Sequence, residues 1–229
     1  EAFAAALRQV MARHDILRTA VVWEGLTSPV QVVWREAILP VQEVEFDPAR
    51  GAIIDQLHER FDARRYRLDV SQAPLLRLMY ARDPAHNRVV GILLFHHLAM
   101  DHIALEAMRE EIHACLSGSA EPLAAPVPYR NYVAQTRLGV SEQEHEAFFR
   151  QMLADIDEPT LPFALQNVQG DGSNIEEAEQ ALTSDLYQRL QQQARLAGVS
   201  VASLIHLAWA QVLSATSGQQ SVVFGTVLM

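Results

Sequence analysis

Hydrophobic positions along the chain recur with two periods, one typical of helices and one of strands. Apolar residues at three- and four-residue steps predict helices over 1–13, 50–65, 102–117, 129–138 and 141–156. Alternating or continuous apolar stretches predict strands over 17–23, 30–34, 41–46, 74–80 and 89–96. The stretch VVGILLFH, at 89–96, is so continuously apolar that we expect a buried central strand. The mixture of both kinds of element predicts an α/β or α+β fold.

The last third of the chain predicts a smaller set of elements. Ser184 could cap a helix that ends at Gly198. Ser200 could cap another helix that runs to about Ala215, on which apolar residues again recur at helical steps. Residues 175–182, between a loop and these helices, could form a strand.

Two stretches rich in turn-forming residues interrupt these elements. Residues 118–128 predict a linker, and the Pro, Gly and Asn content of 157–174 is typical of a boundary between lobes. Both ends of the chain predict interrupted elements. The helix over 1–13 has no capping residue before it, and the apolar run at 221–229, which predicts a last strand, ends without a turn. We therefore expect the chain to be a piece of a longer one.

Composition and charge disfavour several classes of protein. The 229 residues include 18 Lys and Arg against 28 Asp and Glu, which gives a formal charge of −10, and 49% are hydrophobic, as in an ordinary globular domain. The acidic balance argues against a nucleic-acid or anionic-membrane partner. The single Cys115 excludes an internal disulfide and a cysteine-rich metal site. Because we find no apolar run of membrane-spanning length and no basic-then-apolar leader, we expect no membrane association and a cytoplasmic location.

The one dense group of chemically active side chains lies at 96–102, with the sequence HHLAMDH. Three imidazoles and a carboxylate fall where the predicted strand over 89–96 ends and the predicted helix over 102–117 begins. Side chains at such a junction are often both rigidly held and accessible. Because neighbouring strand residues point to opposite faces, His96 and His97 cannot line one pocket in the same way. We expect one of them to pack as a brace and the other to face an opening.

Less specific explanations exist for these residues. Asp101 could be the N-cap of the helix over 102–117, or could combine that role with another. A strand histidine is often a hydrogen-bonded core residue. A metal site is disfavoured, because adjacent strand histidines do not easily chelate one ion and the chain has no HExxH helix. Elsewhere, His206 and Trp209 lie on an apolar helical stretch, and we expect them to pack in a core.

The segment LLFHHLAMDH, at 93–102, resembles the HHxxxDG signature of condensation domains from nonribosomal peptide synthetases. Other CoA-dependent acyltransferases share its HxxxD core. RHDILRTAV, at 13–21, resembles the family's RHExLRTxF, with Asp15 for Glu and Val21 for Phe. Three further segments follow in the family's order: APLLRL at 73–78, YRNY at 129–132 and VVFGTVL at 222–228. The family's opening SxAQxR-type motif and most of its second half have no counterpart, which agrees with the interrupted ends.

The resemblance implies a chloramphenicol-acetyltransferase-like fold of two lobes, with the active site in a tunnel between them. Residues 1–165 would be most of the N-terminal lobe, and 166–229 the truncated start of the C-terminal lobe. The implied reaction is amide formation between an aminoacyl or peptidyl thioester on an upstream carrier protein and the amine of an aminoacyl thioester on a downstream carrier. Both substrates would arrive on phosphopantetheine arms, with an adenylation domain adjacent. The domain itself would bind no cofactor and no metal.

The resemblance also implies a role for the residues of this motif. His97 would face the reacting atoms and act as a general base or as a hydrogen-bonding positioner of the amine. His96 would brace the site from behind. Asp101 would form a structural ion pair with an arginine, for which Arg18 is the first candidate and Arg13 the second.

One position departs from the signature, because His102 stands where the family has Gly. Glycine tolerates unusual backbone angles and leaves room beside the tunnel, so His102 would fill that room and tune which substrates pass. Three alternatives stay open: an epimerization-type domain, a catalytically silent carrier-docking domain, which His102 makes plausible, and a stand-alone acyltransferase that uses soluble CoA thioesters. We expect little or no activity from the isolated chain, because half of the tunnel is absent.

Overall fold

The computed structural model describes residues 1–118, 123–165, 170 and 175–226. The chain divides into two compact units, Glu1–Ser141 and Glu142–Met229, and each is described by itself. The expected lobe boundary between residues 165 and 166 falls inside the second unit, at the edge of a stretch outside the described residues, and it stays a prediction. Helices and strands are both present, which confirms the mixed fold class.

The first unit contains two β-sheets and the helices around them. Its elements in chain order are α1 (Ala2–Arg13), η1 (Asp15–Arg18), β1 (Thr19–Val22), β2 (Val30–Val33), β3 (Val41–Glu43), η2 (Pro48–Arg50), α2 (Ile53–Arg60), β4 (Leu76–Asp83), η3 (Pro84–His86), β5 (Arg88–Phe95), α3 (His102–Ser117) and α4 (Tyr129–Leu138), where η marks a short 3-10 helix. The described part of the second unit contains α5 (Glu142–Met152), η4 (Pro162–Ala164), α6 (Ser184–Ala197) and α7 (Val201–Ser217).

The order of the strands differs from the expectation. β1 and β2 form an antiparallel pair, and the second sheet has the order β3-β4-β5, in which β3 runs parallel and β5 antiparallel to β4. The prediction of a central strand at 89–96 is wrong, because in the described residues β5 is an edge strand and β4 is central. A continuous run of apolar side chains indicates that both faces of a strand are covered. It does not indicate the position of the strand in the sheet, which depends on which segments pair.

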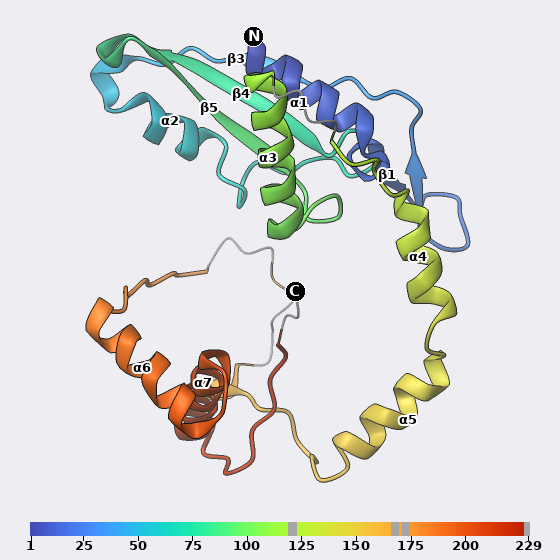
Figure 1. Ribbon diagram of the computed structural model, residues 1–229, viewed down its shortest axis with the longest axis vertical. Coiled ribbons are helices and arrows are strands. Elements are labelled where there is room, and N and C mark those ends of the chain that lie inside the picture. The colour runs from blue at the N-terminus through green and yellow to red at the C-terminus, as the bar shows by residue number, and fades with distance from the viewer. Residues whose placement is uncertain (119–122, 166–169, 171–174, 227–229) are drawn as a thin grey trace. The chain divides into compact units, whose positions relative to one another are not determined.

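Helices cover both faces of the three-stranded sheet (Figure 1). α2 packs on one face, where Leu57 shares a buried cluster with Met79 of β4. α1 and α3 pack on the other face, where Leu7 and Ile112 share a second cluster with Leu76. From residue 90 onward, the even-numbered residues of β5 pack against the first cluster, and Leu93 and Phe95 pack against the second. This two-sided cover explains why the sequence of β5 is apolar without alternation.

Capping residues set the observed helix boundaries. α3 occupies the expected range, 102–117. Ser200 caps α7 as expected, since its Oγ accepts the backbone N–H of Ser203 at 3.0 Å. The cap of α6 is Thr183, whose Oγ1 accepts the N–H of Leu186 at 3.3 Å, and not the predicted Ser184. Both hydroxyl side chains can cap a helix, so the sequence could not separate the two neighbours.

Two strands that the sequence predicts in the second unit are not formed by the described residues. Residues 175–182 and 221–226 have no strand structure, and 227–229 lie outside the described residues. The prediction that His206 and Trp209 pack in a core is also wrong for this chain, because both are exposed. The reason is common to these cases. Apolar residues pair or become buried only when another segment covers them, and the described part of the second unit supplies too little such cover.

A buried carboxylate holds the hairpin that joins β4 to β5. Asp83 is 4% exposed and accepts hydrogen bonds from Nε of Arg88 at 2.8 Å and from Nδ1 of His86 at 2.9 Å. The hydrogen bond from Arg88 is the main reason that the pKa of Asp83 lies below its ordinary value, and desolvation partly opposes that shift. The ionised carboxylate is therefore the form that the folded hairpin favours.

We expect Asp83→Asn to lower the thermal unfolding midpoint of the 229-residue chain at pH 7. A carboxyl group whose pKa is lowered by folding stabilises the folded state above its unfolded pKa of about 3.9, and this contribution is lost as the pH falls through the lower folded-state value. The gap between wild type and variant should therefore close on acidification below about pH 4. Glu24→Gln, at an exposed position, serves as the control. Equal midpoints for wild type and Asp83→Asn at pH 7 would contradict this role.

Candidate active site

The turn that carries the histidine pair follows directly from β5. The backbone N–H of His96 donates to the carbonyl of Leu75 at 3.1 Å, which continues the pairing of the two strands. The N–H of Ala99 donates to the carbonyl of His96 at 2.9 Å and closes the turn. Met100 is 3% exposed and belongs to the buried cluster between α1 and α3. Backbone hydrogen bonds therefore fix the start of the turn, and burial fixes its end.

The half-buried ring of His96 also serves this turn. Its Nδ1 accepts the backbone N–H of Leu98, with 3.1 Å between the two nitrogens. Because Nδ1 accepts, the neutral ring carries its proton on Nε2, and the hydrogen bond selects that tautomer. This contact supports the interpretation of His96 as a brace.

The His97 side chain is exposed. Its ring centre lies 5.9 Å from the ring centre of Phe95, and the two ring planes are inclined by 56°. An aromatic side chain of β5 therefore flanks the imidazole, while the ring stays accessible to solvent and to a substrate. An accessible neutral imidazole can accept a proton or a hydrogen bond from an incoming amine. The ring that the sequence marks as chemically active is thus presented on the surface of the first unit and not in its core.

Asp101 caps helix α3. Its backbone is extended, with φ −99° and ψ −172°, and its Oδ1 accepts the N–H of Ala104 at 2.8 Å. The N-cap interpretation is therefore confirmed. A carboxylate at this place also interacts favourably with the helix dipole. The cap fixes the first turn of α3, which begins directly after the histidine turn.

The two arginines considered as partners of Asp101 have other partners. The guanidinium of Arg18 donates to the carbonyl oxygens of Trp34 and of Arg35, at 2.9 Å for the latter, and its Nε is buried without a hydrogen bond. Arg13 binds a glutamate of α3. The described residues thus contain no ion pair between Asp101 and either arginine. The pair of Asp101 with Arg18 stays a prediction.

His102 is the first residue of α3 and is exposed. Its backbone is helical, and it is not among the described residues with positive φ. The conformational freedom of the family's glycine is therefore not needed at this position. The exposed side chain stands at the start of α3 on an ordinary helical backbone.

The contacts of residues 13–15 were not anticipated from the sequence. Arg13 and His14 hydrogen-bond to the carboxylate of Glu111 on α3. Asp15 accepts the backbone N–H of Tyr129 at the start of α4. Glu111 belongs to no motif. The sequence offers one weak indication of its role. Glu111 stands directly before Ile112, which is buried, and a charged side chain beside a core needs a hydrogen-bonding partner.

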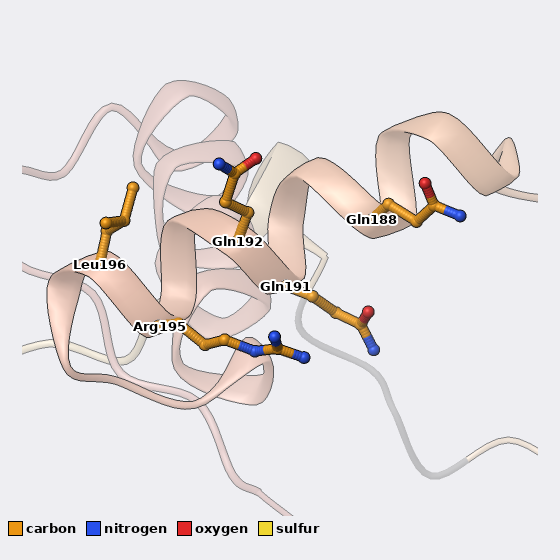
Figure 2. A pocket seen from close by; sticks show the side chains of 5 residues that line it. All are labelled: Gln188, Gln191, Gln192, Arg195 and Leu196. Carbon is orange, nitrogen blue, oxygen red and sulfur yellow. The ribbon is translucent and has the colours of Figure 1, made fainter.

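Two hollows lie away from the histidine turn. In the first unit, a groove of about 980 Å³ lies between the start of α1 and the sheet, and its lining includes Phe3, Tyr80 and Arg82. In the second unit, a hollow of about 440 Å³ is lined by one polar side of α6 (Figure 2). Its lining residues are Gln188, Gln191, Gln192, Arg195 and Leu196. His97 lines neither of them.

The described residues show neither a metal-ligand cluster nor a single membrane-spanning helix. Within them, His, Cys, Asp and Glu form no group of three or more that could hold a metal ion. Within the same residues, each helix taken alone is too short or too polar to cross a membrane. α6 and α7 together satisfy the length and composition test, but the pair is bent by 102° at the break between them.

Residues 1–229 match the condensation-domain family, and the chain therefore belongs to it. Malpinin synthetase of Mortierella alpina is 54% identical over 226 residues, which are 99% of this chain. A linear gramicidin synthase of Brevibacillus parabrevis is 32% identical over 236 residues, which cover 97% of this chain. The chain spans 3% of the length of each of these relatives.

Solved structures share the fold. The EpoB NRPS cyclization-docking bidomain of Sorangium cellulosum aligns with a TM-score of 0.71 at 22% identity, over 96% of this chain and 45% of that chain. The resemblance to condensation domains of nonribosomal peptide synthetases and the chloramphenicol-acetyltransferase-like fold class are thus confirmed. Domains of this family are acyltransferases that form amide bonds, and they work with carrier-protein domains.

The cap at Asp101 can be tested by substitution. Asp101→Ala removes the acceptor for the N–H of Ala104, and loss of an N-cap lowers the free energy of unfolding by about 1 kcal/mol. Asp101→Asn keeps a side-chain oxygen and should retain most of the stability. Chemical denaturation of the 229-residue chain measures both variants. If Asp101→Ala is as stable as wild type, the hydrogen bond to Ala104 does not stabilise the domain.

Proposed function

We propose that this chain, completed by the rest of its synthetase, joins a carrier-bound aminoacyl or peptidyl thioester to the amine of an aminoacyl thioester on a second carrier. The observation that carries the proposal is the exposed imidazole of His97 at the end of β5, on a turn held by backbone hydrogen bonds. Family membership supplies the reaction class. Both substrates arrive on phosphopantetheine arms, and the adjacent adenylation domain loads the downstream carrier. The composition favours a cytoplasmic enzyme.

The proposed reaction needs little electrophilic help from the protein. The amine nitrogen attacks the thioester carbonyl carbon, the C–N bond forms, the C–S bond breaks, and the thiol of the donor's arm leaves. The proton lost by nitrogen ends on that sulfur. His97 accepts this proton and passes it on, or holds the amine by a hydrogen bond while the proton moves. Because a thioester is already activated, holding two tethered reactants end to end supplies much of the rate.

The neighbouring side chains have supporting roles in this proposal. His96 holds the turn through its bond from Leu98, and Asp101 holds the first turn of α3. His102 narrows the passage beside the reacting atoms. In the same proposal, Arg18 is the ion-pair partner of Asp101. The 229-residue chain alone is inactive, since the other half of the substrate tunnel is supplied by other residues of the synthetase.

One observation bears on the rival functions. A silent carrier-docking domain was made plausible by His102, and the helical backbone at this position shows that the residue fits there without the backbone angles that only glycine adopts readily. An epimerization-type domain and an acyltransferase that uses soluble CoA thioesters would show the same turn. They differ in their product, which is an inverted stereocentre in the first case and acyl transfer from free CoA in the second.

The test is His97→Ala in the full-length synthetase. We expect transfer between loaded carriers to fall by about 10²-fold or more, as is usual when a proton-transfer group is removed. Because the side chain is exposed, the substitution should leave the unfolding midpoint within a degree or so of wild type. His113→Ala, an exposed histidine on α3, is the matched control. Transfer at the wild-type rate in His97→Ala would remove this residue from the mechanism.

His102→Gly tests the proposed role of the departure from the signature. The change restores the family's residue at an exposed helix start and should keep the turn and the transfer activity. Removing the imidazole opens the passage, so carriers loaded with bulkier aminoacyl groups should gain several-fold in kcat/KM relative to the native substrates. Competition between two loaded donors in one assay measures the ratio. An unchanged ratio would mean that position 102 does not select substrates.

A further inference from the structure

The carboxylate of Glu111 on α3 binds Arg13, the last residue of α1, and His14, which caps the end of that helix. Nε of Arg13 lies 3.1 Å from Oε2 of Glu111, and Nε2 of His14 lies 3.0 Å from each of the two carboxylate oxygens. An ionised carboxylate only accepts, so both nitrogens donate to it. The side chains of Arg13, His14 and Glu111 are 26%, 30% and 18% exposed, which places the group partly out of water. Hydrogen bonds to charged groups are stronger in such surroundings.

The same segment holds two further parts of the first unit. Nη2 of Arg13 donates to the carbonyl of Ala124 at 2.7 Å. Asp15 accepts the backbone N–H of Tyr129 at 3.0 and 3.1 Å, one distance for each carboxylate oxygen. The cap residue of α4, Pro128, makes no side-chain hydrogen bond, so Asp15 supplies the acceptor that this helix end requires. Three consecutive residues thus tie α1 to α3, to the segment at 124 and to α4.

This group is connected to the histidine turn through one helix and one core. Glu111 precedes Ile112, which belongs to the same buried cluster as Met100 in the turn. α3 begins at His102, and nine residues of helix span about 14 Å. Because a helix is stiff over this length, fixing it against α1 at Glu111 sets the direction in which its first turn points. The turn with His97 is attached directly to that end.

We propose that Glu111 is a positioning residue for the reaction at His97, which it serves by fixing α3 against α1 through Arg13 and His14. The inference rests on the proposed function of the domain. Without the carboxylate, Nε of Arg13 and Nε2 of His14 lose their acceptor, and the described contacts that remain between α1 and α3 are apolar. Apolar contacts are not directional, so the helix can shift on its core. A displacement of about 1 Å at a reacting group can cost about 10²-fold in rate.

The first experiment uses the full-length synthetase with Glu111→Ala, Glu111→Gln and the control Glu110→Ala. Glu110 is the exposed neighbour on the same helix. For Glu111→Ala we expect kcat of carrier-to-carrier transfer to fall by about tenfold or more, with KM for both carriers within about twofold. Glu111→Gln keeps one acceptor oxygen and should recover part of the loss, and Glu110→Ala should match wild type. All rates are measured well below the unfolding midpoint of each variant and per folded molecule.

A residue that only stabilised the fold would lower the unfolding midpoint and leave kcat per folded molecule unchanged, and that result would overturn the proposal. An equal loss of kcat in Glu110→Ala would also overturn it. A rise in KM for the carriers with unchanged kcat would place Glu111 in carrier binding instead of positioning.

A second readout does not depend on catalysis. Diethyl pyrocarbonate modifies accessible imidazoles, and fragment mass spectrometry locates the label within residues 96–102. We expect the ratio of His97 to His96 labelling in the full-length protein to change by several-fold in Glu111→Ala and not in Glu110→Ala. An unchanged ratio refutes the positioning role even if the wild-type synthetase shows no transfer. Failure of transfer in the wild type would count against the proposed function alone.

Discussion

The connection between β5 and α3 is the constraint on which the candidate site depends. Within six residues the chain passes from a strand that pairs with its neighbour, through a closed turn, to a capped helix. The backbone bond from His96 to Leu75 fixes the entry, and the burial of Met100 fixes the exit. Net, each hydrogen bond contributes about 1 kcal/mol and a buried methionine about 1.5–3 kcal/mol. Together they hold the exposed ring of His97 on a backbone that has few alternative conformations.

Two segments far apart in the sequence belong to the helices that pack on this core. The segment 13–15 ends α1, and the segment 96–102 begins α3, and both helices pack on the same face of the three-stranded sheet. The polar contacts of the first segment lie at the border of that core, where partial desolvation strengthens them. Two sequence motifs that look independent are thus parts of one local structure.

The two units differ in how far they bury their apolar side chains. In the first unit helices cover both faces of a sheet, and the strands are apolar for that reason. In the second unit, Leu207 of α7 is 57% exposed and Trp209 is 49% exposed. The described residues of the second unit do not cover these apolar side chains of α7, so its apolar sequence alone does not make it a buried helix.

Several helices of both units could be predicted from the sequence, because the signals for them are local. The range of α3, its cap at Asp101 and the cap of α7 at Ser200 each depend on a side chain within three residues of the backbone group that it satisfies. The histidine group could be found for the same reason, since its chemistry lies within seven consecutive residues. The choice of Ser184 over Thr183 failed because two adjacent hydroxyls offer the same hydrogen bond.

Tertiary structure alone decided what depends on segments distant in the chain. The edge position of β5, the partners of Arg18 and the partners of Glu111 all involve contacts between residues that lie apart in sequence. The sequence does not indicate which opposite charge a charged side chain will pair with, because the packing of the helices on the sheet determines the partner. The sequence by itself therefore predicted most elements of the first unit and located the histidine group. The packing determined which distant side chains contact the elements that carry this group.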